Sequence, residues 1–86
     1  MEKHLILGVH ITDRLENAAH VQQLFTKYGD RIKTRLGLHE PGPAGCGPNG
    51  LVLLELRGAE SDADELAARL NDIKGVEAKK LVFEHR

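Results

Sequence analysis

The apolar residues of this chain repeat every second position in some segments and at helical spacing in others, and the order of the two periods limits the fold. Apolar side chains at alternate positions predict a strand, and a period of about 3.6 residues predicts a helix. The predicted elements are, in order, a strand over 5–11, a helix over 14–28, strands over 30–39 and 51–57, a helix between Ser61 and Gly75, and a strand over 76–84. The chain therefore reads βαββαβ.

Residues typical of helix termini flank both predicted helices. Asp13 precedes the first helix with Glu16 three residues later, and Ser61 precedes the second with Asp64 at the same spacing. This spacing lets each side chain satisfy backbone N–H groups of the first turn. The predicted C-terminal ends are marked by glycines, Gly29 and Gly75.

Two βαβ units with right-handed crossovers place both helices on one face of a four-stranded antiparallel sheet, the ferredoxin-like α+β arrangement. We expect one such domain over residues 1–86. In the last strand the apolar phase changes between Ala78 and Leu81, which predicts a bulge near Lys79 and Lys80.

The predicted sheet has one face under the helices and one bare face. The helix-facing side is expected to carry Leu5, Leu7, Val9, Ile11, Ile32, Leu36, Leu38, Val52, Leu54 and Leu56. On the bare face we expect Ile6, Gly8 and His10 from the first strand and Leu51, Leu53 and Glu55 from the third. An apolar patch in the middle of a sheet face usually marks an interface. We therefore predict a homodimer or tetramer whose interface includes Ile6, Gly8, His10, Leu51 and Leu53.

Composition favours a partner and excludes several classes of protein. With 86 residues, two Phe, one Tyr and no Trp, the chain has little bulk for a core of its own. Its single cysteine, Cys46, excludes an internal disulfide and a Cys-rich zinc module. A net charge of −1 provides no field for direct nucleic-acid binding. The apolar run at the N-terminus is too short for a membrane span, so we expect a cytoplasmic protein. We also expect no cofactor.

Residues 40–50 hold all three prolines and predict a long hairpin loop between two strands. His39 precedes this loop and Cys46 lies within it, and imidazole and thiolate are ligands for zinc, nickel or copper. A site of this kind needs more ligands, from His10, His4 or a second subunit at the interface. The simpler interpretation is a polar strand end and a loop cysteine.

Several motifs resemble small ACT-like regulatory domains over nearly the whole chain. They are ILGVHITDR, RLGLHE, CGPNG, LVLLEL and LNDIKGVEAKKLVF. The similarity is greatest to the stand-alone regulators of the iron-only hydrogenase system. It implies an oligomeric, non-enzymatic domain that senses a small molecule or a metal. The metal-binding half of nickel-responsive repressors has the same fold, but this chain lacks the His-x-His motif of that family.

The resemblance also implies an effector site in the first turn of the first helix, over Asp13, Arg14, Leu15, Glu16 and Asn17. A helix N-terminus favours a carboxylate, although Asp13 and Glu16 as simple caps would satisfy the same N–H groups. We thus expect a regulatory or ligand-sensing module that acts through partners. The alternatives are a metal-binding protein that uses His39 and Cys46, and a small dimeric α+β enzyme with His10 and His39 as its acid–base pair.

Overall fold

A computed structural model describes residues 3–12, 14–39 and 50–84, apart from the side chains of Arg14, Leu15, Glu16 and His39. Over these residues the elements follow the predicted order. They are β1 (Lys3–Ile11), α1 (Arg14–Lys27), a 3₁₀ turn (Gly29–Arg31), β2 (Ile32–His39), β3 (Gly50–Leu56), α2 (Glu60–Asn71) and β4 (Val76–Glu84).

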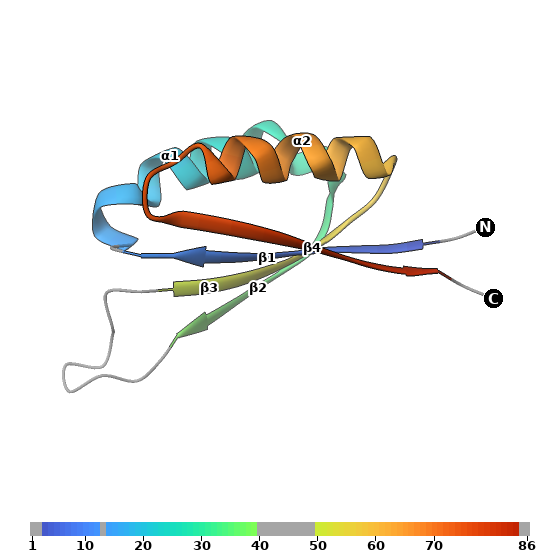
Figure 1. Ribbon diagram of the computed structural model, residues 1–86, viewed down its shortest axis with the longest axis horizontal. Coiled ribbons are helices and arrows are strands. Elements are labelled where there is room, and N and C mark those ends of the chain that lie inside the picture. The colour runs from blue at the N-terminus through green and yellow to red at the C-terminus, as the bar shows by residue number, and fades with distance from the viewer. Residues whose placement is uncertain (1–2, 13, 40–49, 85–86) are drawn as a thin grey trace.

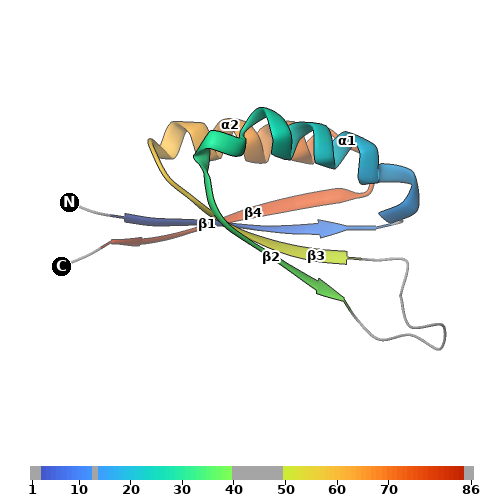
Figure 2. The same cartoon turned by 180° about the vertical axis from the view of Figure 1, so that it is seen from behind.

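The four strands form one antiparallel sheet in the order β2-β3-β1-β4, so that β1 and β3 are central. Both helices lie on the same side of this sheet, and no described residue forms a helix on the other side (Figures 1 and 2). The ferredoxin-like α+β fold is therefore confirmed. Neither described helix is long and apolar enough to cross a membrane.

The core lies between the helices and the sheet, and β1 contributes most to it. Its alternate residues Leu5, Leu7, Val9 and Ile11 are buried, as predicted from their spacing. The side chains that meet them are Val21, Phe25, Tyr28, Leu54, Leu56, Ala63, Leu66, Leu70, Val76 and Ala78. No polar or charged residue in the described part of the chain is buried. The free energy gained by burying these apolar side chains is therefore not offset by the cost of desolvating a charge.

The prediction that Leu36 and Leu38 belong to the core is wrong. Between Ile32 and Thr34 the register of β2 against β3 shifts by one residue. Because side chains alternate along a strand, one extra residue moves every later position to the opposite face. Leu36 and Leu38 therefore lie on the bare face, 51% and 42% exposed.

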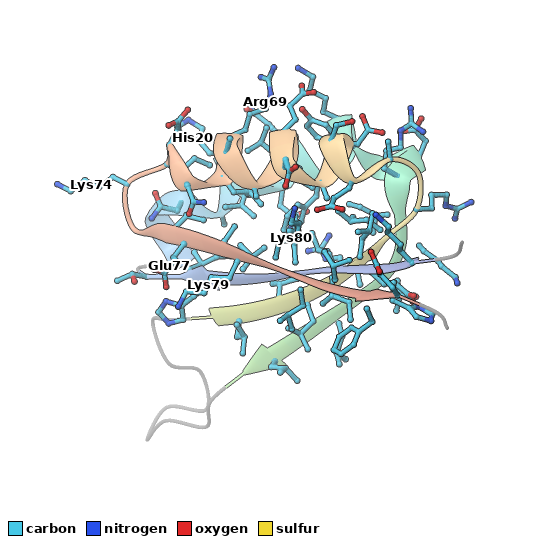
Figure 3. All side chains as sticks on the ribbon, turned by 45° about the vertical axis from the view of Figure 1, so that its right-hand side comes forward. His20, Arg69, Lys74, Glu77, Lys79 and Lys80 are labelled. Carbon is cyan, nitrogen blue, oxygen red and sulfur yellow. The ribbon has the colours of Figure 1, made fainter. Side chains whose placement is uncertain are left out.

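The prediction of a bulge near Lys79 and Lys80 is also wrong. β4 pairs with β1 without interruption from Glu84 to Val76. Leu81 and Phe83 are out of phase with Ala78 because they lie on the bare face. Lys80 shares the helix-facing phase with Ala78 and lies between β4 and α2 (Figure 3).

Ion pairs explain why a lysine is tolerated on the helix-facing side of β4. The Lys80 ammonium lies 2.6 Å from a carboxylate oxygen of Glu60 and 2.5 Å from one of Asp64, both on α2. The hydrogen bonds that Lys80 donates, first to Asp64 and then to Glu60, raise the pKa of Lys80. Asp64 thus pairs with Lys80 on β4 instead of capping its own helix.

The predicted cap of the second helix is wrong as well, because α2 begins at Glu60, after Ala59, and Ser61 lies within its first turn. Gly75 has a φ of +86°, which fits its predicted place after the helix. Gly29 does not have a positive φ and instead continues from α1 into the 3₁₀ turn. The predicted cap at Asp13 lies outside the described residues.

The reassignment of Leu36 predicts unequal costs for two identical substitutions. Leu54→Ala should lower the free energy of unfolding by about 2–5 kcal/mol, because it leaves a cavity in the core. Leu36→Ala should cost an isolated copy about 0.5 kcal/mol, as for other surface changes. Urea unfolding at high dilution measures both values, and equal costs would place Leu36 in the core after all.

Candidate functional site

A band of apolar side chains, most of them exposed, lies on the bare face of the sheet. It crosses all four strands. We call this set the open-face patch: Ile6, Leu36, Leu38, Leu51, Leu53, Leu81 and Phe83. Its most exposed members are Leu81 at 56% and Phe83 at 55%, on β4. In the view of Figure 3, side chains of β2 and β3 extend away from the helices on this side.

Strand register makes the open-face patch continuous. Leu36 pairs with Leu53 across β2 and β3, and the next row toward the β2–β3 connection pairs Leu38 with Leu51. On the other side of β1, Ile6 pairs with Leu81. Facing side chains on neighbouring strands are close enough for van der Waals contact. Leu53 faces Gly8 and Ile6 faces Glu55, so Leu53 and Ile6 are diagonal neighbours that link the two groups of pairs. The patch therefore runs diagonally, from the β2–β3 corner of the sheet to the C-terminal end of β4.

Gly8 lies in the middle of this band, as predicted. It pairs with Leu53 on one side and with Lys79 on the other. A Cβ added at Gly8 would meet only Leu53 Cδ2, at 3.8 Å, so the single copy has room for a side chain here. A strand interior is weakened by glycine. What glycine provides at this position is a shallow gap over the backbone.

Sequence reasoning found only part of the patch. Ile6, Leu51 and Leu53 were predicted there, and His10 lies beside them on the same face, opposite Leu51 and Glu77. Leu36, Leu38, Leu81 and Phe83 were missed. The signal for Leu81 and Phe83 was present in their phase, since they keep the alternation of β4 without any bulge.

Polar groups border the patch beside Ile6. His4 Nδ1 lies 3.0 Å from Glu55 Oε2, and the ring N–H donates to the carboxylate. Thr34 Oγ1 donates to the other oxygen at 3.5 Å, and the Lys33 ammonium lies 3.9 Å from Glu55. The hydrogen bond from His4, aided by the charge of Lys33, lowers the pKa of Glu55. The carboxylate is thus held ionised at the edge of an apolar surface.

The same end of the sheet has a polar cavity of about 590 Å³, where β1 begins and α2 follows β3. Lys3, Lys33, Glu55, Arg57 and Glu60 are among the residues that line it. Lys3 pairs with Glu60 at 3.4 Å, so cations and carboxylates are interleaved there. This interleaving gives the cavity no single charge with which to select a ligand.

The predicted effector segment is described only in part. Asp13 lies outside the described residues, as do the side chains of Arg14, Leu15 and Glu16. Asn17 is described, and its Nδ2 donates to the Thr12 carbonyl at 3.0 Å.

The same turn is tied to the one after α2. The Thr12 N–H donates to the Gly75 carbonyl at 2.7 Å, and a Cβ on Gly75 would come within 2.9 Å of Asn17 Nδ2. The backbone hydrogen bond from Thr12 therefore joins the turn before α1 to the turn after α2, and Asn17 lies against the place where they meet.

The predicted metal ligands are not brought together by described atoms. Cys46 and the side chain of His39 lie outside them. The rest of the described chain holds no group of three or more His, Cys, Asp or Glu side chains placed to bind a metal ion. The site at His39 and Cys46 stays a prediction.

The two histidines of the predicted acid–base pair lie in different rows of the sheet. His10 pairs with Leu51, whereas His39 pairs with Gly50, which itself faces Ile11 on β1. β3 separates them, so they are not cross-strand neighbours.

A second cavity, which sequence reasoning missed, lies on the helix side of the sheet. It has a volume of about 250 Å³ and lies between α1 and the edge strand β2. The register shift in β2 brings Arg35 and Gly37 to this side, where Arg35 lies over the ring of Phe25. Predicting this cavity from the sequence would have required knowledge of the register shift, a β-bulge, between Ile32 and Thr34.

Comparison with known proteins supports the fold alone. No protein-family profile matches the chain, and no curated protein does. Among solved structures, the chain is similar to the uncharacterized protein TM1266 from Thermotoga maritima, with 24% sequence identity and a TM-score of 0.80. The match covers 96% of this chain and 100% of that one. The whole βαββαβ unit is therefore shared.

Three lowered carboxylate pKa values predict acid sensitivity. The pKa of Glu55 is lowered by His4, that of Glu60 by Lys80, and that of Glu65 by the Tyr28 hydroxyl. A carboxyl group whose pKa is lower in the folded state stabilises that state at any pH above its unfolded pKa, which is about 4.3 for Glu. This stabilisation is lost as the pH falls through the folded-state pKa. The free energy of unfolding should therefore decrease between about pH 5 and pH 3.

Glu60→Gln should make this decrease smaller, because it removes one of the three carboxylates. The matched control is Glu77→Gln, which removes an exposed carboxylate that forms no ion pair in the described part of the chain. Urea unfolding at several pH values provides the comparison. Equal pH profiles for wild type and Glu60→Gln would contradict the role of the Lys80 pair.

Proposed function

We propose that this protein is an ACT-like regulatory module that works as a homo-oligomer, assembled through its open-face patch, and senses a small molecule. The observation that carries the proposal is the patch itself. Seven large apolar side chains lie together on a face that neither α1 nor α2 covers. A surface of this kind on a small domain normally marks an interface.

Covering this face with a second copy is more favourable than leaving it in contact with water. The core of one copy is built on one side of the sheet only, and a small domain buries a limited fraction of its surface. Each buried Å² of apolar surface contributes roughly 25 cal/mol, so covering the patch adds stability that a single copy lacks. In a two-fold dimer the same patch serves both partners, which requires a surface complementary to itself.

The gap over Gly8 supports close approach of the partner. Without a side chain there, a residue of the second copy can reach the sheet backbone beside Leu53. The bordering charges of Glu55 and Lys33 on one side and Lys79 and Glu77 on the other then surround an apolar centre. This arrangement, an apolar core with a polar rim, is typical of protein interfaces.

The regulatory part of the proposal comes from the motifs that resemble stand-alone ACT-like regulators and from the fold that carries them. Assembly gives such a module a means of response, because a ligand that binds one arrangement of the copies better shifts the population toward it. The influence on transcription or enzyme maturation is proposed to pass through partner proteins.

Assembly through the patch is tested by Leu36→Glu. The charge would have to be buried in the interface, so this variant should sediment as a monomer at micromolar concentration while the wild type sediments as a dimer or tetramer. Ala68→Glu is the matched control, since Ala68 is exposed on α2, away from the bare face, and the control should keep the wild-type mass.

Gly8→Val gives an independent test of the same interface. The added side chain fits the single copy, because its Cβ meets only Leu53 Cδ2 at 3.8 Å. It should leave the monomer folded and weaken assembly by filling the gap. A wild-type protein that sediments as a monomer, or a Leu36→Glu variant that assembles normally, would rule out this interface.

Ligand sensing is tested by thermal unfolding in the presence of amino acids, other small carboxylates, nucleotides and divalent metals. A ligand present at 100 times its Kd stabilises the folded state by about 2.7 kcal/mol, which raises the midpoint by several degrees. We expect one small-molecule class to do so. A midpoint that no compound changes would contradict the sensing role and leave the interface test unaffected.

A further inference from the structure

The cleft between α1 and β2 has the features of a binding site within a single copy. Its floor is apolar and is formed by Ile11, Val21 and Val52, from β1, α1 and β3. Its rim carries Arg35 and Gln22, and its volume is about 250 Å³. An apolar pocket with a few placed polar groups is the usual form of a small-molecule site.

Arg35 is held at the rim by two contacts. Its guanidinium carbon lies 4.9 Å from the centre of the Phe25 ring, and Nη1 donates to Gln22 Oε1 at 3.2 Å. The cation–π contact and the hydrogen bond both favour this position of the guanidinium. They hold the side chain over Phe25, beside the apolar floor of the cleft.

The guanidinium keeps donors for another partner. It has five N–H groups, and the described contacts engage one of them, with Gln22. None of the ion pairs between described residues involves Arg35. A carboxylate matches the remaining donors, because its two oxygens fit the guanidinium fork.

Gly37 gives the cleft its space. It pairs with Val52, so it lies on the helix-facing side of β2, two residues beyond Arg35. A Cβ at this position would meet nothing within 4 Å. A β-branched residue would suit the strand better, and glycine leaves the volume open instead.

We propose that this cleft binds a small aliphatic carboxylate, with the carboxylate on Arg35 and a branched hydrocarbon chain over Ile11, Val21 and Val52. The volume of about 250 Å³ equals about eight water molecules at roughly 30 Å³ each, and so admits a ligand of about eight non-hydrogen atoms. The proposal rests on the proposed function in that it names the ligand class of a sensing module. The cleft belongs to one copy and does not require assembly.

The test uses 4-methylpentanoate, which has a branched chain and a single carboxylate, and its neutral amide, 4-methylpentanamide. Titration followed by calorimetry or by amide chemical shifts should show binding of the acid. The amide should bind at least tenfold more weakly, because it lacks the charge that Arg35 selects. Equal affinities for acid and amide, or no binding of the acid at millimolar concentration, would overturn the proposal.

Variants locate the site. Arg35→Gln should weaken binding of the acid at least tenfold, whereas Arg57→Gln, the same change on an exposed arginine away from the cleft, should leave it unchanged. Gly37→Val should abolish binding and keep the thermal midpoint at or above that of the wild type, because the side chain enters open space. Full binding by Gly37→Val would place the acid elsewhere and overturn the proposal.

The Leu36→Glu variant separates this inference from the proposed assembly. Leu36 lies on the bare face, so the variant should bind 4-methylpentanoate with wild-type affinity as a monomer. If the acid binds to a wild-type protein that never assembles, the proposed interface is ruled out and the proposed binding site is supported. If the protein assembles but does not bind the acid, the binding site is ruled out and the interface is supported.

Discussion

The position of β1 in the centre of the sheet is the constraint on which the rest of this structure depends. It pairs with β3 on one side and β4 on the other, without a register shift in either ladder. Its buried residues alternate with Ile6, Gly8 and His10, so a slip by one residue would expose the core and bury the bare face. Both faces of the sheet are therefore fixed by one strand.

The two helices then create an imbalance between those faces. They cover one side only (Figure 1), where Leu7, Leu54, Leu66 and Leu70 are fully buried. The apolar residues on the other side have no helix over them. A chain with few aromatic residues thus divides its apolar side chains between a buried core and an exposed patch. The proposed second copy would cover the exposed patch.

A single irregularity in β2 shapes both the open-face patch and the cleft between α1 and β2. The extra residue between Ile32 and Thr34 turns Leu36 and Leu38 to the bare face. The same shift turns Arg35 and Gly37 toward α1, where one stacks on Phe25 and the other leaves room. Removing the bulge would exchange the two sets, with leucines filling the cleft and Arg35 on the patch. The bulge thus links the proposed interface to the proposed ligand site.

The sequence by itself determined the order of the elements, the buried face of β1 and the placement of Ile6, Leu51 and Leu53 opposite the core. These follow from periodicity, which is local and can be read along one strand. The face that each residue of β2 occupies came only from the tertiary structure, because a bulge shows in the pairing with the partner strand and the residues of β2 alone carry no mark of it. The tertiary structure also decided that Asp64 pairs with Lys80 and that Arg35 stacks on Phe25, since these side chains meet only once distant segments pack together.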